Sequence, residues 1–287
     1  MTAAQASENF GQQVPPLRII SNRGTSSELT RVSSKLDFQD LRALLDGDIA
    51  ILRIPKFYSQ KLCKKYASKM IEDDRISVYQ NPGAEKVHRI GLSYFETYEN
   101  PMLYEQYYQQ ALPNIRQSRN LFLPNLSPMD KLRLELEEVW PGGATLENIE
   151  GKTMSVGLSR VIKTNAEILP HVDVLQWDAP KCWRANELTT QLGGNVFLQV
   201  AKGGELELWC KKLSRQEYEM MKIPGSYGID RQHLGNPDVA IQPQVGDLIL
   251  FQSTYVHAVK PVTAGVRVTM SCFIGYRSAN QCLSYWS

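Results

Sequence analysis

Two short stretches in the second half of the chain carry residue types that bind metals. His171 and Asp173 are separated by one residue, and a second histidine, His257, follows later. Side chains alternate along a β-strand, so an imidazole and a carboxylate two positions apart point to the same side of it. Two imidazoles and one carboxylate on one face of a metal ion leave other coordination positions open, as in non-heme Fe(II) sites. The spacing therefore predicts a metal site formed by His171, Asp173 and His257.

Each of these three residues also has a plainer interpretation. His171 and Asp173 could form a local ion pair on a surface strand, because a histidine and an aspartate at this spacing occur by chance in many proteins. His257 could be a core histidine that is hydrogen-bonded to a carbonyl group. The metal interpretation is favoured because a further signal follows at Arg267.

Arg267 stands in a largely apolar run, 266–274, and shares one face of the predicted strand with Thr269. A lone buried charge is costly, so this guanidinium needs an anionic partner. It can form two parallel hydrogen bonds with a carboxylate, and a hydroxyl group can add one more. These residues predict a bound molecule that carries a carboxylate. The alternative is a structural salt bridge.

Helix signals dominate the N-terminal half, 35–145. Asp37 can cap a helix that Gly47 ends, and Asn100 and Ser127 each precede a proline that suits a first helical turn. A further segment repeats apolar residues at helical spacing. The helices expected from these signals are 38–46, 58–70, 102–112 and 129–140, with a strand at 49–54.

Short runs of β-branched and aromatic residues fill the second half of the chain, separated by Gly, Pro and Asn. The strands expected are 153–162, 168–175, 193–201, 204–210, 238–243, 247–252, 255–262 and 266–276. They predict an α+β fold in which a jelly-roll core, 150–287, is buttressed by the helices of the N-terminal half. Residues 35–287 would form this single domain, after a loosely ordered arm at 1–34. Residues 211–237 form a long insertion of the kind that often covers a binding site.

Composition and charge narrow the possible partners. The chain has 287 residues, a net charge of +2 and no concentrated basic groove, which argues against nucleic acid. No apolar run is long enough for a membrane span, and the first residues lack the pattern of a signal peptide. Five cysteines without a CxxC pair argue against a disulfide framework and a structural zinc site. Together these features predict a protein of the reducing cytoplasm.

The order of the motifs resembles that of the Fe(II)- and 2-oxoglutarate-dependent oxygenases. The matching pieces are His171-Val172-Asp173, the stretches 203–208 and 246–251, His257, and Arg267-Val268-Thr269. The resemblance implies a double-stranded β-helix, or cupin-like, core. It also implies that the two histidines and Asp173 bind Fe(II), and that Arg267 and Thr269 hold the far carboxylate of 2-oxoglutarate. O2 is then the second cosubstrate, succinate and CO2 are released, and no catalytic residue is needed beyond the metal centre.

The helical half, the glycine-rich stretch and the tail 284–287 also resemble the freestanding hapalindole-type halogenases. Those enzymes carry a glycine at the position of Asp173, where halide binds. A carboxylate there implies hydroxylation of an unactivated C–H bond, or a related desaturation or cyclisation, in place of chlorination. The expected substrate is a small molecule of specialised (natural product) metabolism, with Trp177 and Phe251 as candidate pocket walls.

Two other functions stay open: a peptide or protein hydroxylase of the same superfamily, and a non-catalytic cupin-like binding module. Arg267 argues against both, since prolyl hydroxylases often carry lysine at this position and a purely structural metal site needs no group that binds a carboxylate. Three further charged residues could contact the substrate, but the interpretation favoured for them is solvated loop charge: Arg160, Asp178 and Arg184.

Overall fold

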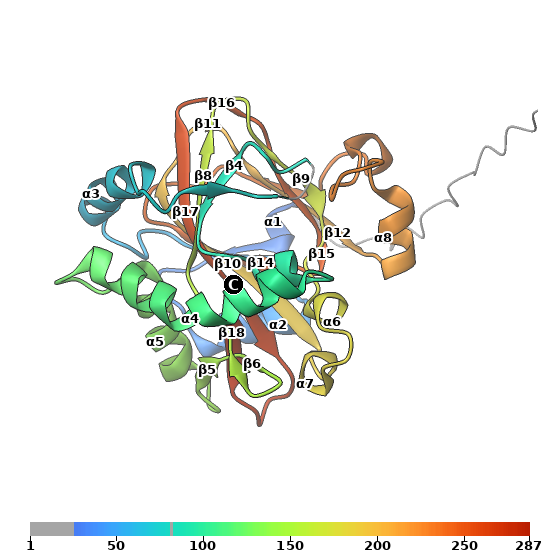
Figure 1. Ribbon diagram of the computed structural model, residues 1–287, viewed down its shortest axis with the longest axis horizontal. Helices are drawn as coiled ribbons and strands as arrows, with labels where there is room; N and C mark the ends of the chain where they lie inside the picture. The colour runs from blue at the N-terminus through green and yellow to red at the C-terminus, as the bar shows by residue number, and fades with distance from the viewer. Residues whose placement is uncertain (1–25, 81–82) are drawn as a thin grey trace, which may run out of the picture.

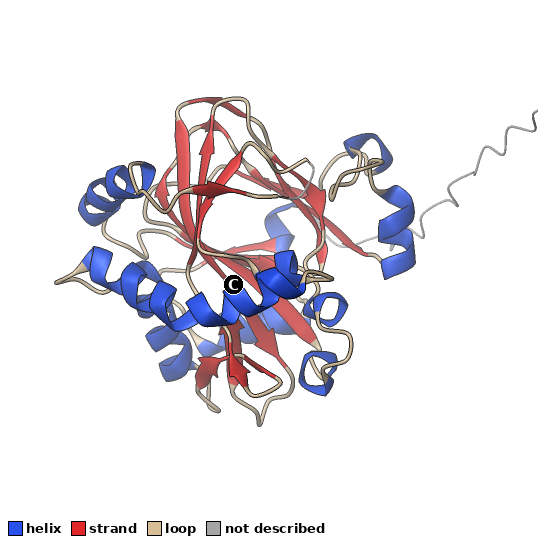
Figure 2. Cartoon of the chain, viewed as in Figure 1, coloured by secondary structure: helices blue, strands red, loops and turns tan. Residues whose placement is uncertain are grey.

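The strands of the second half of the chain form two sheets that pack against each other, as the computed structural model shows for residues 26–80 and 83–287 (Figures 1 and 2). Apolar side chains fill the space between them, with Phe197 and Ile249 from the larger sheet meeting Leu206 and Leu208 from the smaller one. The arrangement is the predicted jelly roll, a double-stranded β-helix. Helices from the N-terminal half lie against the larger sheet.

The larger sheet has ten strands, in the order β1-β2-β14-β10-β17-β8-β4-β3, with β18 paired to β17 and β5 paired to β18. Their bounds are β1 (Thr30–Val32), β2 (Ile51–Ile54), β3 (Ser77–Val78), β4 (Val87–Ile90), β5 (Ala144–Leu146), β8 (Leu158–Lys163), β10 (Thr190–Gln199), β14 (Leu248–Gln252), β17 (Val266–Tyr276) and β18 (Leu283–Trp286).

The smaller sheet has the order β13-β12-β15-β9, and two short pairs, β11-β16 and β6-β7, complete the described strands. The bounds are β6 (Asn148–Ile149), β7 (Lys152–Thr153), β9 (Ile168–His171), β11 (Lys202–Gly203), β12 (Leu206–Lys212), β13 (Val239–Ile241), β15 (Tyr255–Val259) and β16 (Val262–Ala264).

The helices of the N-terminal half begin where the capping signals predict. Asp37 accepts a hydrogen bond from the Asp40 amide at 2.9 Å, and Ser127 accepts one from the Asp130 amide at 3.0 Å. The helices of the N-terminal half are α1 (Ser26–Leu29), α2 (Phe38–Asp46), α3 (Gln60–Ile71), α4 (Pro101–Phe122) and α5 (Pro128–Val139), with a short 3₁₀ turn, η1 (Tyr94–Thr97). The second half contains the short helices α6 (Leu175–Asp178), α7 (Trp183–Asn186) and α8 (Arg215–Met221), and the 3₁₀ turn η2 (Arg231–His233).

Several elements differ from the sequence expectations, and three of the differences are described here. Helix α4 continues through Pro113 to Phe122, because Pro113 is on the exposed side, where water can solvate the carbonyl that the proline leaves unpaired. The strand expected at 168–175 ends at His171, and the short helix α6 follows. Strand β18 was not expected at all, because its partners β17 and β5 are set by tertiary pairing.

The predicted N-terminal arm is partly ordered. Residues 26–29 form helix α1, and β1 pairs in parallel with β2 from Thr30 to Val32. This pairing gives β1 partners for its backbone groups, so the prediction of a loose arm was wrong for this part. Residues 1–25 of the arm lie outside the described residues.

Strand β17 shows how the larger sheet separates core from cavity. Val268, Met270 and Ile274 belong to the main hydrophobic core, which also contains residues of the covering helices. The alternate residues Arg267 and Thr269 line a cavity on the other side of the sheet. The pleat therefore turns one face of this strand toward the helices and the other toward the site.

Candidate metal centre and cosubstrate pocket

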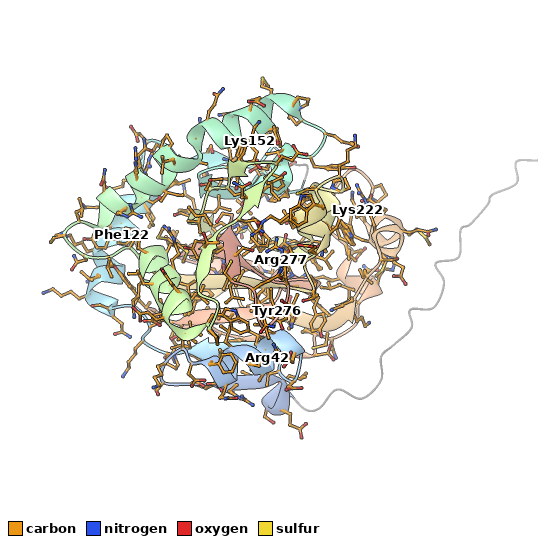
Figure 3. All side chains as sticks on the ribbon, turned by 90° about the horizontal axis from the view of Figure 1, so that it is seen from below. Arg42, Phe122, Lys152, Lys222, Tyr276 and Arg277 are labelled. Atoms are coloured by element: carbon orange, nitrogen blue, oxygen red, sulfur yellow. The ribbon has the colours of Figure 1, made fainter. Side chains whose placement is uncertain are left out.

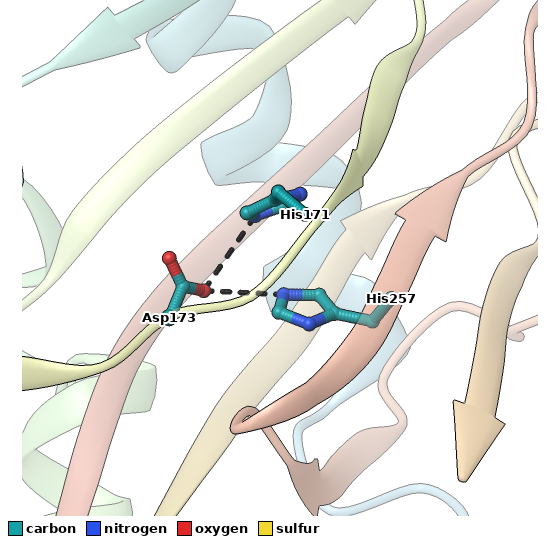
Figure 4. A group of neighbouring side chains, drawn as sticks. All are labelled: His171, Asp173 and His257. Carbon is teal, nitrogen blue, oxygen red and sulfur yellow. Dashed lines mark ion pairs between the residues drawn. The ribbon is translucent and has the colours of Figure 1, made fainter. Parts of the chain in front are cut away.

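His171, Asp173 and His257 come together on the smaller sheet (Figure 4). Strands β9 and β15 pair with His171 directly opposite His257. Asp173 lies two residues beyond the end of β9, where its amide donates to the Ser253 carbonyl at 3.0 Å. Its Oδ2 lies 3.1 Å from His257 Nε2 and 3.6 Å from His171 Nε2. The predicted convergence of these three side chains is therefore found.

Backbone carbonyls fix the orientation of both imidazole rings. His171 Nδ1 lies 2.8 Å from the Leu169 carbonyl oxygen, and His257 Nδ1 lies 2.9 Å from that of Tyr255. A carbonyl can only accept, so each Nδ1 carries the proton and each Nε2 is left with a lone pair. Both lone pairs face the carboxylate of Asp173. Three electron-pair donors that converge in this way repel one another unless a cation lies between them, which is the arrangement of a metal site.

Burial and mutual interaction set the charge states of these groups. Burial alone would raise the pKa of Asp173, but the positive charge that His171 and His257 carry whenever they are protonated outweighs it and holds the pKa below its usual range. Burial, followed by the neighbouring His171, lowers the pKa of His257. An ionised carboxylate and a neutral imidazole are the forms that bind metal ions.

Arg267 projects into the same cavity and has no anion beside it. Its side chain is almost fully buried, at 3% exposure, and its guanidinium lies over the ring of Phe197, 5.0 Å from the centroid. Within residues 26–80 and 83–287 it forms no ion pair, and its Nε has no hydrogen-bond partner. Burial, and then the like charge of Arg160, lower its pKa to about 9. The structural salt bridge considered as an alternative is absent from the described residues.

Gly204, in the glycine-rich stretch 203–208, leaves room for the side chain of Arg267. Gly204 adopts a positive φ of +72°, and a Cβ there would lie 3.3 Å from Arg267 Cδ. A larger residue at this position would be strained and would press on the arginine. Thr269 lines the cavity next to Arg267 on the same face of β17.

The metal cluster, Arg267 and Thr269 share one cavity of about 590 Å³. The two predicted wall residues, Trp177 and Phe251, line it as well, but at different depths. Phe251 packs its ring against His257, with centroids 5.0 Å apart. It fits there because Gly193 faces it: a Cβ on Gly193 would come within 2.5 Å of the ring. Trp177 lies against Tyr218 of helix α8, so it belongs to the outer part of the cavity.

Two charged residues that were interpreted as solvated loop charges also line the cavity, so that interpretation was wrong for them. Arg160 lies on β8, where it donates to the Tyr79 hydroxyl at 3.0 Å and to Ser271 Oγ at 2.6 Å. Asp178 is the last residue of α6. Alternation along the predicted strand 153–162 would have placed Arg160 on an inner face. Asp178 had no such signal, because the one-turn helix α6 to which it belongs was not expected from the sequence.

The third of these charges, Arg184, lies elsewhere. Its Nε forms an ion pair with Glu147 Oε1 at 2.6 Å, next to the buried Arg277. Arg184 is therefore a structural residue that does not line the cavity.

The insertion 211–237 covers one side of the cavity, where Figure 1 shows α8 projecting from the sheets. It contributes Tyr218, Lys222 and Tyr227 to the lining. Arg215 bridges the opening, because it donates to the Tyr98 hydroxyl at 2.6 Å and to the Trp177 carbonyl at 3.4 Å. The segment thus contacts the outer wall of the site.

Comparisons with known proteins agree with this geometry. Residues 156–275 match the family described as the 2OG-Fe(II) oxygenase superfamily. An N-substituted L-amino acid dioxygenase from Burkholderia ambifaria AMMD has the same fold, with 16% identity and a TM-score of 0.58 over 87% of this chain and 91% of that one. Its complex with alpha-KG gives 15% identity and a TM-score of 0.54 over 87% and 90% of the two chains. No curated protein matches.

The chain matches the 2OG-Fe(II) oxygenase superfamily over residues 156–275, the segment that contains His171, Asp173, His257 and Arg267. It is accordingly a non-heme iron dioxygenase that uses Fe(II), 2-oxoglutarate and O2. Within the described residues, no helix is both long and apolar enough to cross a lipid bilayer.

Proposed function

We propose that His171, Asp173 and His257 hold Fe(II), that Arg267 and Thr269 bind the far carboxylate of 2-oxoglutarate, and that the enzyme hydroxylates an unactivated C–H bond of a small molecule. The observation that carries this proposal is a single cavity in which three lone-pair donors converge and an unpaired, buried guanidinium faces them. A molecule with two carboxylates can span the metal-binding side chains and Arg267, because one end can ligate a metal ion while the other pairs with the guanidinium.

Each residue has a defined task in this proposal. Iron supplies the activation of O2, coupled to decarboxylation of the 2-oxo acid. The two histidines and Asp173 fix the ion and leave the remaining coordination positions free for 2-oxoglutarate and O2. Arg267 orients the cosubstrate, and the ring of Phe251 shields His257 from water. Trp177, together with Tyr218 of the insertion, would contact the substrate at the outer end.

The dimensions of the cavity and the state of the cysteines support a small substrate in a reducing compartment. A volume of about 590 Å³ matches that of a pocket for a small molecule together with its cosubstrate. One relative of the same fold is described as acting on N-substituted amino acids, which are substrates of this size. All five cysteines are free thiols, which agrees with the cytoplasm as the compartment. We place the reaction in natural product biosynthesis.

The test is production of succinate from 2-oxoglutarate under O2 by the Fe(II)-loaded protein, compared with the His171→Ala and His233→Ala variants. His233 is an exposed histidine outside the cavity and serves as the matched control. We expect His171→Ala to lose activity by about a thousandfold or more, since one metal ligand is gone. We expect His233→Ala to keep the activity of the unmodified protein. Equal turnover in His171→Ala would refute the assignment of the metal site.

The reaction type is checked on the product. Hydroxylation adds one oxygen atom from O2 to the substrate, whereas desaturation removes two hydrogen atoms and adds none. Incubation of the active protein with a metabolite pool under ¹⁸O₂, followed by mass spectrometry, separates the two. A product that lacks the heavy oxygen would contradict hydroxylation.

A further inference from the structure

Like Arg267, the carboxylate of Asp178 has no oppositely charged partner among the described residues. Asp178 ends helix α6, directly beyond Trp177, and is partly buried. It lines the same cavity as the metal cluster. Within the part of the chain that the structure describes, its carboxylate forms no hydrogen bond and no ion pair. A carboxylate held away from water without a cation is unfavourable, so its position in a binding cavity suggests that a ligand completes it.

The other charged groups at this end of the cavity are engaged. Arg215 donates to the Tyr98 hydroxyl and the Trp177 carbonyl and makes no hydrogen bond to Asp178, although its charge acts to lower the pKa of Asp178. Lys222, which lies toward the periphery in Figure 3, pairs with Glu219 at 3.0 Å. Neither of these two cations forms an ion pair with Asp178 in the described residues.

Several aromatic residues line the same cavity as this carboxylate. The rings of Trp177 and Tyr218 lie 5.7 Å apart, and Phe95 and Tyr98 line the same cavity. Burial, and then the charge of Asp173, raise the pKa of Tyr218, and Asp178 makes a smaller contribution in the same direction. Aromatic faces attract cations, and a carboxylate beside several such faces is a combination that recognises an ammonium group.

We propose that Asp178 binds a protonated amine of the substrate, so that the substrate class is small molecules carrying an ammonium group. This inference rests on the proposed function and specifies its substrate. The ammonium would lie at the outer end of the cavity, between Asp178 and the rings of Trp177 and Tyr218. The carbon to be oxidised would then lie deeper, toward His171 and His257.

A rival explanation is that Asp178 acts as a neutral acid. Burial, and then the charge of Asp173, raise its pKa to about 8. A neutral carboxyl group could donate a hydrogen bond to a carbonyl or hydroxyl group of an uncharged substrate. Asp178→Asn separates the two explanations, because an amide keeps the ability to donate a hydrogen bond but cannot carry the negative charge.

The experiment uses phenylalkyl amines with side chains of two to six carbons, each paired with the alcohol that replaces the ammonium by a hydroxyl. Binding to the full-length protein is followed by tryptophan fluorescence, since Trp177 lies beside the predicted ammonium position. Titrations are run on the metal-free protein and, without O2, on the protein loaded with Fe(II) and 2-oxoglutarate. The variants are Asp178→Asn and, as a control for the loss of one negative charge nearby, Glu219→Gln.

We expect the best amine to bind about tenfold more tightly than its alcohol, because a hydrogen bond between two charged groups is stronger than one between neutral groups. Asp178→Asn should abolish this preference, and Glu219→Gln should retain it. The proposal is overturned if no amine binds, if the alcohols bind as well as the amines, or if Asp178→Asn keeps the preference.

Failure of this proposal can be told from failure of the proposed function. The visible absorption band that 2-oxoglutarate gives with bound Fe(II) reports the metal and cosubstrate site alone. The amine preference is read independently from fluorescence in the metal-free protein. A band without amine selectivity refutes only the role of Asp178, whereas absence of the band refutes the iron and 2-oxoglutarate assignment.

Discussion

Two buried arginines, one near each end of strand β17, have opposite surroundings. Arg277, labelled in Figure 3, follows directly after the C-terminal end of β17 and is 7% exposed. Its Nη2 pairs with Glu147 at 2.7 Å, and its other donors reach Ser284 Oγ and the Arg184 carbonyl. Arg267, near the N-terminal end, is buried to a similar extent and has none of these partners.

The difference shows how burial can serve two purposes. A buried ion pair whose hydrogen bonds are satisfied holds segments together, here the Glu147 segment with the ends of β17 and β18. A buried guanidinium without an anion costs stability in the free protein, and this cost is recovered when a ligand supplies the carboxylate. The contrast fits a structural role for Arg277 and the ligand-binding role proposed for Arg267.

The largest expected effect is on the paired arginine. Arg277→Leu leaves the fully buried Glu147 with a charge that Arg184 and Ser284 only partly compensate. We expect the free energy of unfolding to fall by about 3 kcal/mol or more. Urea denaturation measures this change, and the double variant Glu147→Met/Arg277→Met should be less destabilised than Arg277→Leu. A midpoint equal to that of the unmodified protein would contradict the structural role of Arg277.

The second prediction concerns the unpaired arginine. Arg267→Leu should raise the KM for 2-oxoglutarate by about a hundredfold, because a bidentate charged contact is lost. The ligand-free variant should be at least as stable as the unmodified protein, since an uncompensated buried charge has been removed. Thermal unfolding with and without 2-oxoglutarate checks both points, as the ligand should raise the Tm of the unmodified protein only. A strong loss of stability would instead assign Arg267 to the fold.

A third prediction follows from the other unpaired charge, Asp178, whose pKa is raised to about 8 by burial and by Asp173. A raised pKa in the folded protein contributes stability at low pH, and this contribution is lost as the pH rises toward the folded value. Asp178→Asn should therefore be more stable than the unmodified metal-free protein at pH 8, by about 2 °C in Tm or more, with a smaller difference at pH 5. A difference that does not change with pH would contradict the unpaired state of Asp178.

The smallest effect is expected at the exposed arginine of the insertion. Arg215 contacts Tyr98 and the Trp177 carbonyl in a solvated position. Arg215→Ala should change the free energy of unfolding by less than about 0.5 kcal/mol. Limited proteolysis should cut the segment 211–237 faster, because one of its anchors to the rest of the molecule is gone. A loss of stability as large as that of Arg277→Leu would contradict the expectation that exposed contacts contribute less to stability than buried ones.

The inner part of the site could be predicted from the sequence because its geometry is local. His171 and Asp173, and likewise Arg267 and Thr269, lie two residues apart, and the alternation of an extended chain places each pair on one side. The resemblance to the oxygenase family then indicated that these two pairs and His257 belong to one site. The structure places all five around one cavity, with His171 and His257 opposed in register.

The outer part could not be predicted, since it depends on packing between distant segments. Helix α6 is only one turn long and has no side-chain cap, so its conformation depends on packing against η1 and α7. Arg277 finds Glu147 because tertiary pairing brings β5, β17 and β18 together. Neither arrangement leaves a periodic signal in the amino-acid sequence.

The carbonyl groups that hold both imidazole rings have a consequence for how the protein is prepared. With His171 and His257 already oriented, the site does not need to rearrange for any particular divalent ion. Nickel, copper and zinc bind nitrogen and oxygen donors more tightly than ferrous iron does. Supply therefore decides which ion occupies the site, and protein purified from a zinc-rich medium, or over nickel resin, would be inactive until it is stripped with a chelator and reloaded under nitrogen.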